Sequence, residues 1–131
     1  MSSTLKSLRA LSDQTRLRIV ALLEKEELSV NELQEVTHLG QSRISPHLGQ
    51  LQEAGLVQSR REGKRTFYKL NEQADKVATE FIQLAIRGAH ELAEHSHDEI
   101  NLKRVLARRK VFDLEQASAR RMAAVRVRRV R

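Results

Sequence analysis

The sequence predicts a small, mainly helical domain that carries one β-hairpin, and three observations support this fold class. Within residues 41–56, Ile44, Leu48 and Leu51 recur at helical spacing, so they form one apolar face of an α-helix. Residues 57–70 contain strand-favouring Val, Thr, Phe and Tyr around Glu62-Gly63, which is typical of a hairpin. The length of 131 residues suits a single domain, and a helical domain of this size gains stability by dimerising.

Three helices are predicted before residue 41. A short apolar stripe over residues 5–11 forms the first, and Ser12-Asp13 offers caps for the second, which carries apolar residues from 17 to 23. Both are expected in the core. The third helix begins with a capping box, in which Ser29 and Glu32 satisfy each other's backbone donors. Gly40 then breaks the chain before the next helix.

The helix that follows Gly40 has a polar side suited to contacting a partner. Arg43, His47 and Gln50 repeat the apolar spacing on the opposite face, and no carboxylate precedes Glu53. Such side chains pair with base edges in the major groove, Arg with guanine and Gln with adenine. A short helix, a glycine turn and this helix have the layout of a helix-turn-helix. The alternative is an ordinary surface helix with a solvated polar face.

The predicted hairpin concentrates positive charge. Arg60, Arg61, Lys64 and Arg65 surround its tip, where they would contact phosphate or the minor groove. A helix-turn-helix followed by a basic hairpin is the order of a winged helix-turn-helix domain. Simple solvation of a charged turn is the alternative for each of these side chains.

The net charge of +7 is not spread evenly along the chain. Residues 1–102 hold 13 Lys and Arg against 15 Asp and Glu, whereas residues 103–131 hold 11 against 2. DNA binding by the body therefore depends on where its basic residues lie. The absence of cysteine excludes disulfides and thiolate metal sites and fits a reducing compartment. No apolar run could span a bilayer and no signal core follows Met1, so we expect a cytoplasmic protein with no membrane partner.

Several stretches within roughly residues 5–70 form a recognisable set, namely Ala10–Ile19, Glu27–Leu33, Gln41–Ser45, His47-Leu48, Glu53–Val57 and Arg61–Leu70. Together they resemble the signature of the ArsR-type (ArsR/SmtB) family of bacterial repressors. The resemblance implies a homodimeric transcriptional repressor that binds a palindromic operator in double-stranded DNA and leaves it when an effector binds.

The resemblance also assigns residues to DNA contacts. Those that match the family's DNA-reading helix are Gln41, Ser42, Arg43, Ser45 and His47, to which the polar face adds Gln50. Those that match the wing are Arg60, Arg61, Lys64 and Arg65. Pro46 and Gly49 depart from the family's pattern, and they predict a reading helix that is short or bent at its start.

A function of a different class stays open. If Pro46 and Gly49 spoil base reading, the chain is a helical dimer interaction module that binds nucleic acid without sequence preference. Its Arg-rich tail would supply that affinity, since residues 119–131 hold six arginines and no acid. This second function predicts equal affinity for DNA of any sequence, and loss of that affinity when residues 119–131 are removed.

A long apolar stripe from Asn71 onward predicts a terminal helix over residues 71–95 that needs a partner. The family resemblance implies that the partner is the same helix of a second subunit. The expected interface residues are Val77, Phe81, Leu84, Gly88 and Leu92. The predicted division of the chain is a winged helix-turn-helix and dimerisation domain over 1–98, a C-terminal helix over 99–118 and a basic, disordered tail over 119–131.

Two effector classes are candidates. Leu28–Asn31 lies where the family's cysteine motif would be, so the thiolate site is absent. Side chains that could bind a divalent metal instead cluster near the end of the terminal helix, although solvated histidines are the alternative. These metal candidates are His90, Glu94, His95 and His97.

A second resemblance suggests the other effector. Lys103–Lys110, followed by Phe112-Asp113, is similar to the linker of a family branch that leads into methyltransferases or regulates the S-adenosylhomocysteine cycle. S-adenosylhomocysteine is therefore the second candidate. No glycine-rich cofactor loop, nucleophile elbow or paired catalytic constellation occurs in the sequence, so we do not expect an enzyme.

Overall fold

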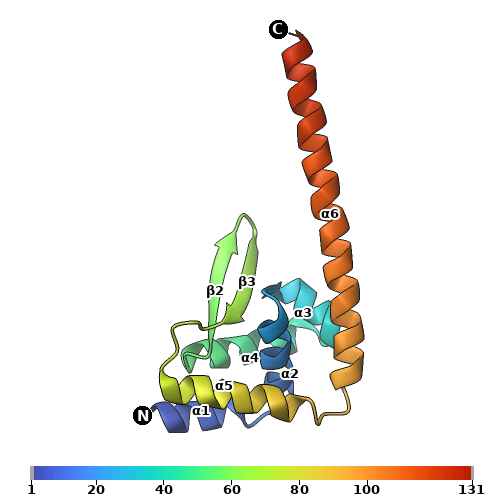
Figure 1. Ribbon diagram of the computed structural model, residues 1–131. Coiled ribbons are helices and arrows are strands. Elements are labelled where there is room, and N and C mark those ends of the chain that lie inside the picture. The colour runs from blue at the N-terminus through green and yellow to red at the C-terminus, as the bar shows by residue number, and fades with distance from the viewer. Residues whose placement is uncertain (1, 131) are drawn as a thin grey trace.

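The computed structural model describes residues 2–130, with side chains through Arg126. These residues form helices and one hairpin in the predicted order, which confirms the mainly helical fold class (Figure 1). The elements are α1 (Ser3–Leu11), α2 (Gln14–Lys25), β1 (Leu28–Ser29), α3 (Val30–Thr37), α4 (Gln41–Glu53), β2 (Val57–Glu62), β3 (Arg65–Leu70), α5 (Lys76–Ala89) and α6 (His95–Val130).

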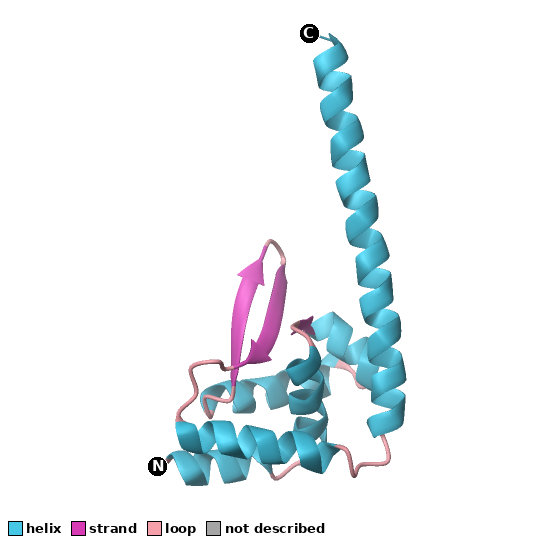
Figure 2. Cartoon of the chain, viewed as in Figure 1, coloured by secondary structure: helices cyan, strands magenta, loops and turns pink. Residues whose placement is uncertain are grey.

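The strands form one antiparallel sheet in the order β1-β3-β2 (Figure 2). β2 and β3 pair along their whole length up to Glu62↔Arg65, and the two-residue turn between them holds Gly63 at φ +61°, a region that glycine adopts readily. β1 extends the other edge of β3 through Leu28↔Tyr68. The sequence predicted the hairpin but not β1, because a strand of two residues is too short to show a periodicity.

α4 runs unbroken for 13 residues although Pro46 lies inside it. Its apolar stripe of Ile44, Leu48 and Leu51 is at most 1% exposed, as predicted. Pro46 removes only the hydrogen bond to the Ser42 carbonyl, on a side of the helix that solvent reaches. The prediction of a short helix was therefore wrong.

The C-terminal end of α4 is capped by a glycine. Gly55 has φ +77°, and its N–H donates to the Gln52 carbonyl at 3.0 Å. The N–H of Leu56 donates to the Leu51 carbonyl, also at 3.0 Å, and the Leu56 side chain is fully buried. These paired bonds define a Schellman motif, which turns the chain from α4 directly into β2.

α1 contributes only Leu11 of its three leucines to the core, whereas the prediction placed the whole stripe there. Leu5 and Leu8 are each 49% exposed, whereas the small residues Ser7 and Ala10 are buried. α1 packs beside α5 (Figure 1). Small side chains at this contact let the two helices approach closely, and Leu5 and Leu8 remain on the outside of the protein.

None of the helices described within residues 2–130 is both long enough and apolar enough to cross a membrane.

The helix predicted over residues 71–95 is shorter in the structure, and the second helix predicted over 99–118 is longer. Asp75 caps α5 by accepting a hydrogen bond from the Ala78 N–H at 2.8 Å, and α5 ends at Ala89. Tight turns follow, in which N–H groups bond to carbonyls three residues earlier, as Leu92 does to Ala89 at 3.1 Å. They redirect the chain so that α6 runs along α2 and α3.

α6 has a packed part and a projecting part. Leu102 and Val105 are buried against the body, whereas beyond Arg109 the helix extends away from it (Figure 1). The sequence predicted a disordered tail from residue 119, but the helix continues to Val130, the last residue that the structure describes. Residues 103–130 contain no Gly or Pro and are rich in Ala and Arg, which favours an uninterrupted helix.

The predicted capping box of α3 is confirmed, and it also forms an ion pair with α6. Glu32 accepts from the Ser29 N–H at 2.9 Å, and Ser29 Oγ accepts from the Glu32 N–H at 3.2 Å. Arg109 donates to both carboxylate oxygens of Glu32, at 2.6 and 2.8 Å. Burial raises the pKa of Glu32, but the hydrogen bonds from Arg109 and Ser29 outweigh it and leave the pKa below its ordinary value.

This pair gives a pH-dependent prediction. We expect Glu32→Gln to lower the free energy of unfolding by about 1–2 kcal/mol at neutral pH, because glutamine keeps the capping box but not the charge. Because the pKa is lower in the folded state, the stabilisation is present above the unfolded pKa of about 4.3 and is lost as the pH falls through the folded pKa. Urea unfolding of the wild-type and Glu32→Gln proteins from neutral to acidic pH should show that the difference between their free energies of unfolding shrinks. A difference that stays constant with pH would contradict the ion pair.

Candidate nucleic-acid interface

The exposed side of α4 carries small side chains before its last turn. At about 100° per residue, the positions most nearly opposite the buried stripe are Ser42, Pro46, Gly49 and Glu53, and all four are exposed, as is Ser45 on one flank. A Cβ atom at Gly49 would meet no atom within 4 Å. Gln41 and Arg43 are also exposed, in the first turn. Small side chains would let the backbone of α4 lie close to the major groove of DNA, while the longer side chains of Arg43 and Gln41 would reach deeper into that groove.

His47 and Gln50 lie on one flank of this surface, and their contact with DNA stays a prediction. Both are on the flank of α4 that faces α2, where Arg16 Nη1 is 3.2 Å from His47 Nδ1 and 2.5 Å from Gln50 Oε1. Arg16 Nε also donates to the Ala10 carbonyl at 2.6 Å, which fixes the guanidinium between α1, α2 and α4. Helical spacing showed that Arg43, His47 and Gln50 share a stripe, but the angle between that stripe and the core was misjudged.

Arg16 is a residue that the sequence analysis did not assign to the site. Arg16 is the third residue of α2, after the Asp13 cap, and this local position does not reveal a contact with α4. The structure makes it a cationic support for the flank of α4, because it contacts two side chains that the family resemblance assigns to DNA reading.

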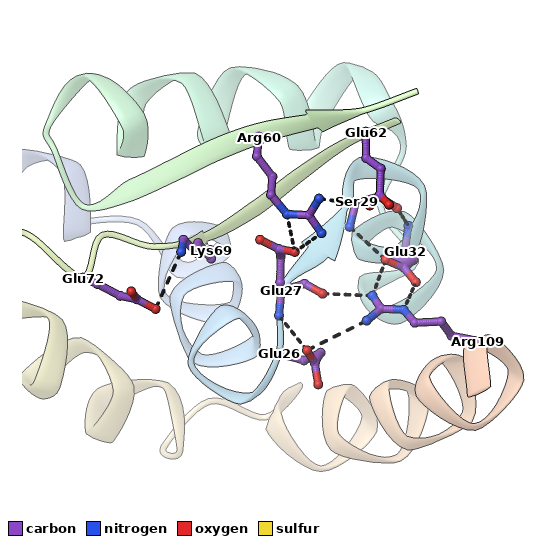
Figure 3. Close-up of polar contacts among 9 residues, drawn as sticks. All are labelled: Glu26, Glu27, Ser29, Glu32, Arg60, Glu62, Lys69, Glu72 and Arg109. Atoms are coloured by element: carbon purple, nitrogen blue, oxygen red, sulfur yellow. Dashed lines mark hydrogen bonds and ion pairs between the residues drawn. The ribbon is translucent and has the colours of Figure 1, made fainter. Parts of the chain in front are cut away.

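The wing has two faces with different electrostatics. Ser59 and Arg61 lie on the face nearer α4, where Gln52 Nε2 donates to Ser59 Oγ at 3.1 Å. Arg60 lies on the other face, where it binds Glu27 at 2.5 Å and Glu62 at 3.0 Å (Figure 3).

The charge of Arg60 is therefore already compensated within the protein. Its guanidinium also lies 4.8 Å from the centre of the Phe67 ring, and hydrogen bonds to Glu27 and Glu62 raise its pKa above the ordinary value. Arg61, Lys64 and Arg65 are exposed and form no ion pair within the part of the chain that the structure describes. These three side chains, rather than all four predicted ones, are the available cations of the wing.

The two neighbouring arginines of β2 should differ in DNA binding. We expect Arg61→Ala to weaken binding to all DNA and to reduce the slope of log affinity against log salt by about 1, as one lost phosphate contact does. Arg60→Ala should leave that slope nearly unchanged, because its charge is held by two carboxylates. Fluorescence anisotropy over a salt series measures both slopes, and equal losses for the two variants would contradict this assignment.

The four metal candidates do not converge. The rings of His90 and His95 stack with centroids 4.4 Å apart, and His95 Nε2 is 3.2 Å from Glu99 Oε1. Glu94 instead accepts from Gln14 Nε2 at 2.7 Å, and His97 is exposed. Within residues 2–130 there is no group of three or more His, Asp or Glu side chains arranged to hold a metal ion.

The fold and this surface define a class of protein. A three-stranded wing follows a helix-turn-helix whose second helix has a fully buried apolar stripe and an exposed polar side. Uncompensated cations surround the wing tip, and Ser59 of the same wing accepts a hydrogen bond from Gln52 of that helix. This arrangement is that of a winged helix-turn-helix DNA-binding domain.

Comparisons with known proteins agree. Residues 13–59 match the model of the family described as "Bacterial regulatory protein, arsR family". The chain is 44% identical to the arsenic resistance transcriptional regulator ArsR1 of Pseudomonas putida over 48% of this chain and 50% of that protein. It is 39% identical to the transcriptional activator HlyU of Vibrio cholerae over 57% of this chain and 69% of that protein. The chain thus spans half to about two thirds of these relatives.

Solved structures show the same fold. The homodimeric winged helix-turn-helix DNA-binding domain Mb0332 from Mycobacterium bovis superposes with a TM-score of 0.57 at 32% identity, over 71% of this chain and 83% of that one. The chain belongs to the arsR family of bacterial regulatory proteins, a family of transcription regulators and not of enzymes. The family predicted from the sequence is confirmed.

Proposed function

We propose that this protein is a homodimeric transcriptional repressor that binds a palindromic operator through α4 and the wing of each subunit and is released by an effector. The observation that carries the proposal is that α4 has an exposed polar side with no carboxylate before Glu53, and that it is followed in the fold by a wing whose tip carries uncompensated basic side chains. α4 would read base edges, while Arg61, Lys64 and Arg65 would bind phosphate or the minor groove. Binding to chromosomal DNA would place the protein in the cytoplasm.

The outer face of α5 supports the homodimer. Val77 and Leu84 are 39% and 54% exposed, and the exposed Leu5 and Leu8 of α1 lie on the neighbouring helix. A Cβ at Gly88 would contact no atom of the chain within 4 Å, so a partner helix has room to approach there. Together these residues form an apolar face that a two-fold symmetric dimer would bury.

Phe81 and Leu92 extend the same interface proposal. Both are half-buried, whereas Ala78 and Ala85 of the predicted apolar stripe face the core of their own subunit. The homodimeric Mb0332 domain, which has the same fold, supports this use of the surface. Leu92 lies in the turn after α5 and would therefore contribute at the end of the interface rather than within the helix.

We infer that S-adenosylhomocysteine is the better candidate effector and should be tested before a divalent metal. The stretch that resembles the branch linker, Lys103–Lys110 with Phe112-Asp113, lies on α6, and Phe112 is 51% exposed. The metal candidates, in contrast, are turned toward different partners. Isothermal titration with S-adenosylhomocysteine tests this branch directly, and absence of heat at millimolar ligand would remove it.

The alternative function, sequence-independent nucleic-acid binding, is favoured by one observation. Arg120, Arg121 and Arg126 are exposed on the projecting part of α6, where the last acidic residue is Glu115. Removal of residues 119–131 distinguishes the functions. It should leave the preference for the operator intact if α4 reads sequence, and it should abolish binding if the Arg-rich segment supplies the affinity.

Arg43→Ala tests the proposed function against a matched surface arginine. Arg43 is exposed in the first turn of α4 and has no side-chain hydrogen bond within the described residues, so its loss should not affect the fold. We expect a loss of about 10- to 100-fold in affinity for the DNA upstream of the protein's own gene, with a much smaller loss for a scrambled fragment. Arg87→Ala on α5 is the control, and equal losses on both fragments would contradict base reading.

A further inference from the structure

A groove separates α2 from α6 and is closed at one end by the last residues of α5. It has a volume of about 430 Å³, which lies in the range of small-molecule sites. Its apolar lining comes from Ala21, Leu22, Ala89, Leu102 and Leu106. None of the exposed leucines of α1 or α5 lines it.

The polar groups of the groove are unequally distributed. At its floor Arg18 binds Asp98 through two hydrogen bonds of 2.8 Å, and these side chains are only 10% and 6% exposed, so the charges cancel within the protein. Lys25 on α2 and Lys103 on α6 line opposite walls and are both exposed. The nearest carboxylate to Lys25 is that of Glu24, at 4.0 Å, which is too weak a contact to neutralise it.

One more carboxylate lines the groove, that of Glu99, whose Oε1 lies 3.2 Å from His95 Nε2, and the His90 ring lies against His95 with centroids 4.4 Å apart. Lys25 and Lys103 outnumber this carboxylate two to one. The groove therefore offers apolar walls and an excess of positive charge. The complementary ligand has an apolar body and one anionic group.

One wall of the groove is physically connected to the DNA-binding elements. Leu106 lines the groove, and one turn farther along α6 Arg109 binds Glu32 at the start of α3. Arg109 Nη2 also donates to the Glu27 carbonyl at 2.9 Å, and the Glu27 carboxylate binds Arg60 of the wing (Figure 3). A shift of α6 would therefore act on both α3 and the wing.

We propose that this groove binds a small amphipathic anion, with an aliphatic or aromatic body and one carboxylate or sulfonate, and that the bound anion changes operator affinity through Arg109. The body of the ligand would rest on Leu22 and Leu102, and its anionic group would bind Lys103 or Lys25. The regulatory part rests on the proposed function, whereas binding to the groove does not.

The binding part can be tested with 1-anilinonaphthalene-8-sulfonate, an aromatic sulfonate that fluoresces when it leaves water. Ala21→Phe fills the groove, and Lys103→Glu reverses one of its charges. The matched controls are Ala107→Phe and Arg104→Glu, which change exposed residues of α6 outside the groove. We expect about tenfold weaker probe binding for the two groove variants and wild-type binding for the controls.

Equal probe affinity in all five proteins would overturn the site, because the probe would then bind another apolar surface. If Ala21→Phe fails to fold, as its circular dichroism would show, Lys103→Glu decides alone, since its side chain is exposed. Decanoate should displace the probe from the wild-type protein; failure of both decanoate and the lysine variant to reduce fluorescence would also overturn the site.

The regulatory part needs operator DNA. Saturating probe should shift the operator affinity of the wild-type protein and of Lys110→Ala, but not that of Arg109→Ala. An unchanged operator affinity at full probe occupancy would overturn the coupling. Failure of the wild-type protein to prefer the operator without any probe would instead count against the proposed function, so the two failures are distinguishable.

Discussion

Asp98→Ala should destabilise the protein by about 3–5 kcal/mol, because it leaves the buried guanidinium of Arg18 without its counter-charge. The two side chains are 80 residues apart in sequence and are joined by two hydrogen bonds of 2.8 Å. Arg18 also donates to the Thr37 carbonyl at 3.1 Å, so the same guanidinium ties α2, α3 and α6 together. The hydrogen bonds to Asp98 raise the pKa of Arg18, which therefore remains charged at any accessible pH. Urea unfolding measures the loss.

The double variant Arg18→Met with Asp98→Leu is the control for this effect. Removing both charges and keeping a similar volume should restore much of the stability that Asp98→Ala loses, because no buried charge then remains unpaired. A loss below about 1 kcal/mol for Asp98→Ala would show that α6 is held by its apolar contacts alone, and would contradict the role assigned to the pair.

Leu84→Arg should convert the dimer into monomers and reduce operator affinity by at least about 100-fold, since two half-sites can then no longer be bound together. Leu84 is 54% exposed in the single subunit, so arginine is tolerated there without loss of the monomer fold. In a two-fold interface each substitution is present twice, and it places unpaired cations in an apolar contact.

Sedimentation velocity measures the change in mass, and anisotropy measures operator binding. Gln83→Arg, at the exposed neighbouring position, is the matched control and should remain dimeric. Wild-type protein that sediments as a monomer at micromolar concentration, or a Leu84→Arg protein that remains a dimer, would contradict the interface.

Features specified by local sequence were predicted well. The buried stripe of α4 and the Ser29–Glu32 capping box each depend on residues within one or two turns of one another, so periodicity and cap chemistry suffice to find them. The hairpin was found for the same reason, because strand-favouring residues surround a turn containing Gly63.

Features that depend on distant contacts were not predicted. The pairing of Arg60 with Glu27 joins residues 33 apart, and that of Arg109 with Glu32 joins residues 77 apart, so no local pattern could reveal that these charges are compensated. The flank position of His47 and Gln50 became visible only once Arg16 was seen between α2 and α4. The groove likewise exists only because α6 turns back along α2, and the turn after Ala89 that allows this has no Gly or Pro to mark it.

Operator recognition is the central claim, and fluorescence anisotropy of the wild-type protein tests it most directly. The DNA upstream of the protein's own gene and a scrambled fragment of equal length and composition are compared at one near-physiological salt concentration. The account predicts a preference of about a thousandfold for the upstream fragment, within the range of specific DNA-binding proteins. Equal affinity for the two fragments would contradict it, and would favour phosphate binding by the exposed arginines of α6 instead.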